Sequence, residues 1–160
     1  MELFLSTFVN RVDRKGRVSV PATFRSTLAT HRHPNQVVLI PSFKYEAIDG
    51  TGSDHLIEMM EGLSTLDQYS DRRDDLALVF AESRSLQIDG EGRIILPDEI
   101  KDYAHIADEV AFVGLGTMFQ LWEPGRFNTH RASARERSRR GGATLPSPGP
   151  SAGSSTGAAR

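Results

Sequence analysis

The sequence contains no cysteine, which excludes disulfide bonds, zinc sites built on thiolates and a cysteine nucleophile. It also has no apolar run approaching about 18 residues, so no membrane-spanning helix is expected. The first ten residues, MELFLSTFVN, have no positively charged segment before their apolar stretch, and no secretion signal is predicted. These absences are compatible with a protein of the reducing cytoplasm that has no membrane partner.

Residues suited to catalysis or metal binding are also sparse. Among five histidines, only His31 and His33 lie close together, beside Pro34, and a histidine pair with no further ligand does not make a zinc site. The GLG sequence at 114–116 has neither the third glycine nor the following helix of a dinucleotide-binding fingerprint, and predicts a hairpin turn. We therefore predict no enzyme, no metal, no cofactor and no small-molecule substrate.

Charge is distributed unevenly along the 160 residues, although the net charge is only −2. Residues 126–160 hold seven arginines against one acidic residue, and residues 1–30 hold five basic residues against two acidic ones. The segment between them is therefore strongly acidic, with a net charge of −11. A polyanionic partner is expected to meet the ends of this chain and not its middle.

One short pattern occurs twice, 76 positions apart, as VDRKGRVSVP at 12–21 and IDGEGRIILP at 88–97. Each copy has an apolar residue, Asp, two variable positions, Gly-Arg, three apolar or small residues and Pro. Aspartate can accept hydrogen bonds from its own downstream backbone, and glycine adopts positive φ at no steric cost. The pattern predicts a tight turn between two strands.

In the first copy, Asp13 and Gly16 are expected to form the turn, and Asp13 to form an ion pair with Arg17 across it. The same structural roles are expected in the second copy for Asp89, Gly92 and Arg93. On this interpretation the role of Asp13, Gly16, Asp89, Gly92 and Arg93 is to hold the turns in shape.

The elements that follow each copy also match. Pro21 and Pro97 are expected to open short helices, since proline is tolerated in a first helical turn. Residues 36–48 and 109–122 each predict a strand, a turn and a second strand. The chain thus reads as a tandem duplication of a strand–turn–strand–helix–hairpin unit.

Further helices are predicted at 54–63, 71–83 and 126–140, the last of them strongly basic. The helix at 54–63 has an apolar packing stripe of Leu56, Met59, Met60 and Leu63. Gly50 and Gly52 predict a flexible stretch before it. The Gly, Ser, Pro and Ala residues at the C-terminus predict disorder. The expected segments are a first repeat at 1–53, connecting helices at 54–82, a second repeat with the basic helix at 83–138 and a disordered tail at 139–160.

The tips of the two turns differ in charge. Arg14 and Lys15 occupy the first tip, whereas Gly90 and Glu91 occupy the second. Either positive or negative side chains at a turn would keep the protein soluble, so solubility does not explain a cationic tip. A tip carrying Arg11, Arg14, Lys15 and Arg17 therefore predicts contact with phosphate. A β-ribbon tip is also narrow enough to enter a DNA major groove.

The doubled Asp-x-x-x-Arg motif, in VDRKGRVSVPATFR and IDGEGRIILPDEIK, resembles that of the MraZ family of bacterial transcriptional regulators over about residues 1–135. The resemblance implies a mainly β, α+β fold of two AbrB-like swapped-hairpin halves, a double-split β-barrel that packs as an internal pseudo-dimer. It implies rings, commonly octamers, that bind direct repeats in promoter DNA of the division and cell-wall gene cluster, in the cytoplasm at the nucleoid. It also implies that Asp13 and Arg17, with Asp89 and Arg93, are the family motif residues.

Two alternatives remain open. The chain could be a ring-forming scaffold that binds other proteins through its acidic middle, and such a protein would tolerate loss of Arg14 and Lys15. It could also be an AbrB-like regulator of the antitoxin type, although those usually carry one motif copy. For the arginines at 131–140, a second phosphate-binding arm and a solvated helix end are both compatible with the sequence.

Overall fold

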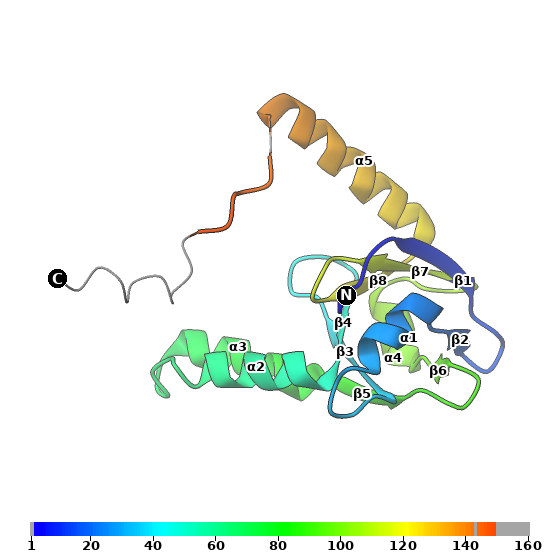
Figure 1. Ribbon diagram of the computed structural model, residues 1–160, viewed down its shortest axis with the longest axis horizontal. Helices are drawn as coiled ribbons and strands as arrows, with labels where there is room; N and C mark the ends of the chain where they lie inside the picture. The colour runs from blue at the N-terminus through cyan, green and yellow to red at the C-terminus, as the bar shows by residue number, and fades with distance from the viewer. Residues whose placement is uncertain (1, 143, 150–160) are drawn as a thin grey trace. The chain divides into compact units, whose positions relative to one another are not determined.

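The computed structural model describes residues 2–142 and 144–149, so residues 143 and 150–160 of the expected tail lie outside the described residues (Figure 1). The strands are β1 Thr7–Arg11, β2 Arg17–Ser19, β3 Gln36–Pro41, β4 Ile48–Thr51, β5 Arg84–Gln87, β6 Arg93–Ile95, β7 Glu109–Gly114 and β8 Phe119–Trp122. The helices are α1 Ala22–Leu28, α2 Ser53–Leu63, α3 Asp71–Glu82, α4 Asp98–Tyr103 and α5 Pro124–Gly141.

The same succession of elements occurs twice. β1, β2, α1, β3, β4 and α2 form the first series, and β5, β6, α4, β7, β8 and α5 form the second, with α3 between them. Pro21 and Pro97 stand directly before α1 and α4 as predicted. The predicted helices at 54–63, 71–83 and 126–140 are confirmed by α2, α3 and α5, and α5 continues three residues past the boundary expected at 138.

The two series are joined through their strands, and all pairing is antiparallel. One sheet has the order β1-β7-β8-β4-β3-β5, and β2 pairs with β6 in a second, two-stranded sheet. β1 therefore pairs with a strand of the second series, and β5 with a strand of the first. Val18 lies opposite Ile94, its counterpart 76 residues later. The fold is mixed α+β with antiparallel sheets.

The core lies between the sheets and the short helices, and aromatic rings occupy its centre. Phe4, Phe24, Phe112 and Phe119 are buried, and the ring centroids of Phe4 and Phe119 lie 4.9 Å apart. Truncating a buried ring of this kind to alanine typically costs about 3–5 kcal/mol. In β2 the buried Val18 alternates with outward residues, and this alternation sends the neighbouring arginine to the surface.

The prediction of a flexible stretch at Gly50 and Gly52 is wrong. Gly50 belongs to β4, and a Cβ atom there would lie 2.3 Å from the ring of Phe119. A Cβ atom at Gly52 would lie 2.4 Å from the imidazole of His31. These glycines are present because another side chain packs directly on the backbone, so the segment is part of the core.

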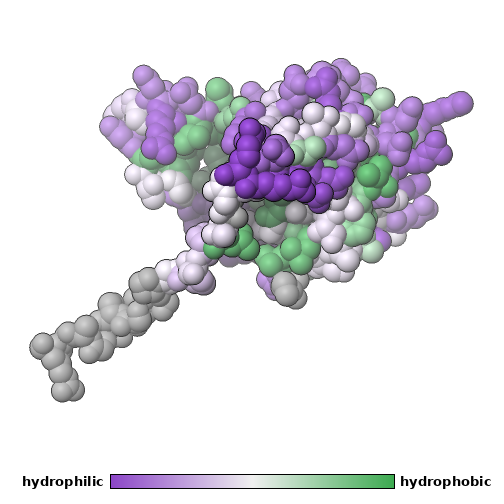
Figure 2. All heavy atoms as spheres, turned by 90° about the horizontal axis from the view of Figure 1, so that it is seen from above, coloured by the Kyte–Doolittle hydropathy of each residue, from purple (hydrophilic) through white to green (hydrophobic). Residues whose placement is uncertain are grey.

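The chain divides into two compact units, Met1–Asn128 and Thr129–Arg160. The first unit includes the start of α5, where Phe127 is buried against Trp122 with ring centroids 6.0 Å apart. Hydrophilic side chains cover most of the face in Figure 2, with smaller hydrophobic areas among them. Among the described residues, no helix has the length and apolar character needed to span a bilayer.

Candidate nucleic-acid interface

The turn between β1 and β2 is closed by the side chain of Asp13. One carboxylate oxygen accepts hydrogen bonds from the backbone N–H groups of Lys15 and Arg17, both at 2.9 Å, and the other accepts from Nε of Arg17 at 2.7 Å. Gly16 has a φ of +80°, the left-handed region that favours glycine, and its N–H donates to the Asp13 carbonyl. The turn geometry is therefore determined by residues within it.

The turn between β5 and β6 is built in the same way. The Asp89 carboxylate accepts from the backbone N–H groups of Glu91 and Arg93, at 2.9 and 3.0 Å, and from Nε of Arg93 at 3.2 Å. Gly92 has a φ of +79°. The predicted ion pairs across both turns are confirmed.

These hydrogen bonds keep both aspartates ionised. The backbone N–H of Arg17, and then its guanidinium, hold the pKa of Asp13 below its usual value. The backbone N–H of Arg93 does the same for the pKa of Asp89. Each turn is therefore closed by an anion throughout the neutral pH range.

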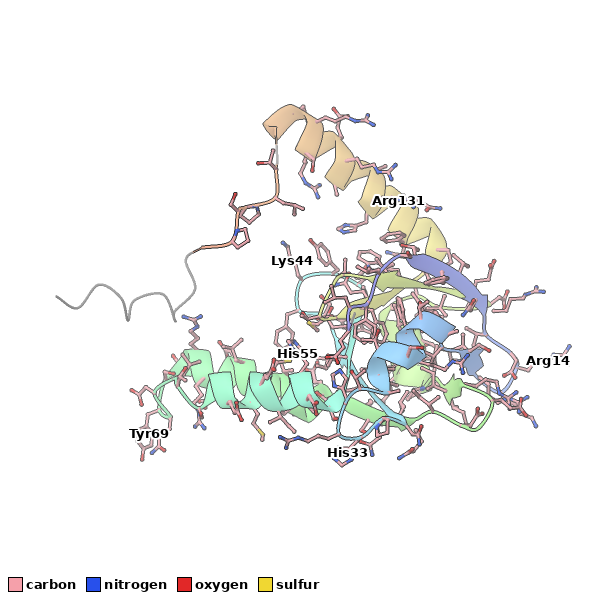
Figure 3. The ribbon with its side chains drawn as sticks, in the orientation of Figure 1. Arg14, His33, Lys44, His55, Tyr69 and Arg131 are labelled. Carbon is pink, nitrogen blue, oxygen red and sulfur yellow. The ribbon has the colours of Figure 1, made fainter. Side chains whose placement is uncertain are left out.

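The tip of the first turn presents cations to solvent. Arg14 and Lys15 are exposed, and neither has an ion-pair partner among the described residues. Figure 3 shows Arg14 extending outward from the turn. Arg11, at the end of β1, is exposed as well, whereas the side chain of Arg17 is held by Asp13. Three of the four predicted contact residues are thus free at the surface, and the fourth shapes the turn.

The tip of the second turn has a different character. Glu91 forms an ion pair with Arg93 at 3.3 Å, and Gly90 adds no charge. The two turns therefore share a backbone scaffold and differ in what the scaffold presents. Exposed cations on a narrow β-turn are suited to phosphate oxygens and guanine edges, whereas an acidic tip repels them.

Two neighbours of these turns were missed by sequence reasoning. A Cβ atom at Gly92 would lie 2.7 Å from Cζ of Arg25, whose Nε donates to the carbonyl of Val20 at 3.1 Å. Arg25 thus brings a cation to the acidic second turn. Asn10 donates its side-chain amide to the carbonyl of Ser19 at 2.7 Å and connects β1 to β2. The contact of Arg25 had no local signal in the sequence, because only the interlocking of the two halves brings it beside Gly92.

Other candidate chemistry has structural explanations. In the part of the chain that the structure describes, no group of three or more potential ligands could hold a metal ion. Nδ1 of His31 accepts from the backbone N–H of Asp54 at the start of α2, at 3.1 Å. The GLG segment forms the predicted hairpin turn between β7 and β8, with Gly116 at a φ of +93°.

The chain is similar to known proteins along most of its length. Residues 79–144 match the MraZ protein family, described as antitoxin-like. A protein of Gluconacetobacter diazotrophicus named transcriptional regulator MraZ is 44% identical over 142 residues, covering 87% of this chain and 90% of that protein. Proteins of the same name from Beijerinckia indica and Rickettsia bellii are 47% and 40% identical, covering 87% and 85% of this chain and 85% and 91% of theirs.

Proposed function

The chain belongs to the MraZ family of transcriptional regulators, which are not enzymes, and on that premise we propose that it binds promoter DNA through the turn between β1 and β2. The proposed targets are short direct repeats upstream of the division and cell-wall gene cluster. The proposed location is the cytoplasm, at the nucleoid.

One observation carries this proposal. Arg14 and Lys15 extend from a turn whose backbone is already fixed by Asp13 and Gly16, so the cations are preorganised on a narrow tip. A preorganised site loses less conformational entropy when it binds. Exposed arginine and lysine at such a tip can neutralise phosphates and reach guanine edges in a major groove.

The proposed roles follow the geometry. Arg14 and Lys15 contact DNA at the tip, and Arg11 contacts the backbone beside it. Arg17 supports the site mainly by holding Asp13. The second turn is proposed to be structural, with the roles held by Asp89, Gly92 and Arg93.

We also propose that the halves are AbrB-like swapped hairpins that form a double-split barrel. Exchange of the first strands, β1 to β7 and β5 to β3, supports this topology. The proposed boundaries are a first repeat at 1–53, connecting helices at 54–82 and a second repeat at 83–138. Several such chains form a ring, with the octamer as the expected size, so that each subunit can engage one repeat.

The test is a double substitution at the tip, Arg14→Ala with Lys15→Ala, measured by fluorescence anisotropy on promoter DNA at physiological salt. Loss of the tip cations should weaken binding at least about tenfold and reduce the dependence of affinity on salt. The assembly should keep its mass, because on this proposal the two side chains contact DNA and not a neighbouring subunit.

The matched control is Glu91→Gln, at the tip of the second turn, which should bind DNA like the parent. If the Arg14 and Lys15 variant binds as tightly as the parent, the assignment of the interface is wrong. That result favours a protein-binding scaffold.

A further inference from the structure

We propose that helix α5 of one chain binds the α2–α3 hairpin of a second copy, and that this contact joins neighbouring subunits. The inference rests on the proposed self-assembly and adds the surfaces that make it. It starts from two oppositely charged helical surfaces that the proposed DNA contact does not use.

The hairpin is acidic. Residues 53–82 hold eight acidic residues and two arginines, a net charge of −6. On α3, the exposed Asp71, Asp75 and Glu82 are spaced by four and seven residues, so they lie along one face of the helix. None of the three has an ion-pair partner among the residues described. The face is available for a cationic partner.

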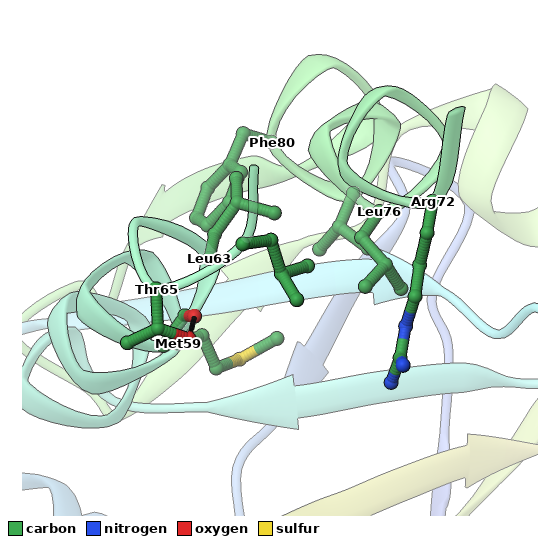
Figure 4. Close-up of a pocket in the computed structure, with 9 residues that line it drawn as sticks. Met59, Leu63, Thr65, Arg72, Leu76 and Phe80 are labelled. Carbon is green, nitrogen blue, oxygen red and sulfur yellow. Dashed lines mark hydrogen bonds between the residues drawn. The ribbon is translucent and has the colours of Figure 1, made fainter. Parts of the chain in front are cut away.

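The hairpin also leaves apolar surface uncovered. α3 has no fully buried residue, and Leu78, on its acidic face, is 52% exposed. Met60, expected in the packing stripe of α2, is 55% exposed. A cavity of about 330 Å³ lies between the helices, lined mainly by Met59, Leu63, Leu66, Leu76, Val79 and Phe80 (Figure 4). A helical pair with this much exposed apolar surface is expected to have a partner.

α5 has the complementary properties. It contains six arginines and one glutamate, a net charge of +5. Arg135 and Arg139 are exposed and one turn apart, about 6 Å along the axis, as are Asp71 and Asp75. Ala132, Ser133 and Ala134 are small enough to allow close approach, and arginine stems can cover apolar surface while their guanidinium groups pair with carboxylates.

Charge favours a second copy of the chain over the other possible occupants. DNA is repelled by the hairpin, and two hairpins repel each other, which disfavours a symmetric contact. A contact between α5 of one chain and the hairpin of the next is heterologous, and contacts of that type generate rings when the rotation closes.

The repeated order of elements points to the same partner. α5 follows β8 as α2 follows β4, and α2 has α3 packed beside it. In the described part of the chain, no further helix follows α5 and packs beside it as α3 packs beside α2. Helix α3 of a neighbouring chain can take this position. Figure 3 shows Tyr69, between α2 and α3, well separated from Arg14, so this contact leaves the cationic turn exposed.

The test exchanges charges across the contact in the full chain. Arg135→Glu with Arg139→Glu, and separately Asp71→Arg with Asp75→Arg, should each lower the mass measured by light scattering after size exclusion. Each should raise the concentration needed for assembly at least about tenfold. The chain carrying all four substitutions should assemble again. Asp75→Arg with Glu82→Arg provides a second acidic-face variant if the first one unfolds by circular dichroism.

Binding to DNA separates this inference from the proposed function. Both two-residue variants should bind one repeat through Arg14 and Lys15 and lose the gain from several repeats. If the arginines of α5 form a phosphate-binding arm instead, Arg135→Glu with Arg139→Glu should weaken binding even to DNA with one repeat. If both charge-reversed variants have the same mass as the parent, or if the chain with all four substitutions does not reassemble, the proposed contact is wrong. Either result leaves the turn between β1 and β2 as the proposed DNA site. A monomeric parent overturns assembly and contact together.

Discussion

At the scale of single residues, the Asp–Arg motif and the tip of the turn do separate work. Asp13 and Arg17 are hydrogen-bonded to each other within the turn. In contrast, the side chains of Arg14 and Lys15 form no ion pair with any described residue. The motif therefore sets a shape that tolerates different tip residues. The second turn illustrates this, since it keeps the same hydrogen bonds around an acidic tip.

This division gives a prediction about titration. Because folding lowers the pKa of Asp13, its stabilising contribution is present above the unfolded value of about 3.9 and is lost as pH falls through the lower, folded value. Arg17→Ala should move the Asp13 midpoint upward, measured by NMR of the carboxyl carbon. Asp89 should not move in this variant, because its partner is Arg93. An unchanged Asp13 midpoint contradicts the role of Arg17.

The exposed tip could be predicted from the sequence, but Arg25 beside Gly92 could not. Turn geometry depends on residues four positions apart, and local rules for Asp and Gly are sufficient to predict it. The contact of Arg25 with Gly92 joins residues 67 positions apart, and it exists only because the two halves interlock. No local pattern encodes such a contact.

At the scale of elements, the helices followed from helical periodicity and proline position, and the hairpin of β7 and β8 lies within the range predicted for it. The strand predicted to end at 48 is displaced, because β4 begins at Ile48 and ends at Thr51. Which strand pairs with which did not follow from these patterns. β1 is adjacent to β7 instead of another strand of its own half, and short strands of similar composition carry little information about their partner. The glycines near β4 were misinterpreted for a related reason, since a missing side chain allows either freedom or close approach.

Gly50 therefore gives a second prediction. Gly50→Ala places a methyl group against the Phe119 ring and should lower the free energy of unfolding by about 1–3 kcal/mol, measured by urea denaturation. The matched control is Gly62→Ala in α2, where a Cβ atom meets nothing within 4 Å. That change should be neutral or stabilising by up to about 1 kcal/mol. Equal midpoints for Gly50→Ala and the parent contradict close packing at β4.

At the scale of the whole molecule, we expect the affinity for DNA to depend on how many turns of one assembly bind DNA repeats at the same time. One turn offers few cations, so a single contact should be weak and sensitive to salt. Linked contacts can raise apparent affinity by about 10²–10⁴ without improving any one of them. Neither the assembly nor its spacing follows from local sequence patterns, because both depend on surfaces of separate chains.

We therefore predict that DNA with several correctly spaced repeats binds at least about a hundredfold more tightly than DNA with one. Competition binding at fixed salt measures this directly. DNA with the same repeats shifted by half a helical turn, about 5 base pairs, is the control and should lose most of the gain. If affinity does not depend on the number of repeats, subunits do not bind in concert.

Because both turns belong to one chain, their sequences have been able to diverge. A dimer of identical short chains must present two identical turns, and its two-fold symmetry matches an inverted DNA sequence. Here the scaffold is nearly symmetric, as the strand order shows, but only one turn is cationic. If DNA binds as proposed, each molecule would therefore have a head and a tail along the double helix, and a row of them would have a direction.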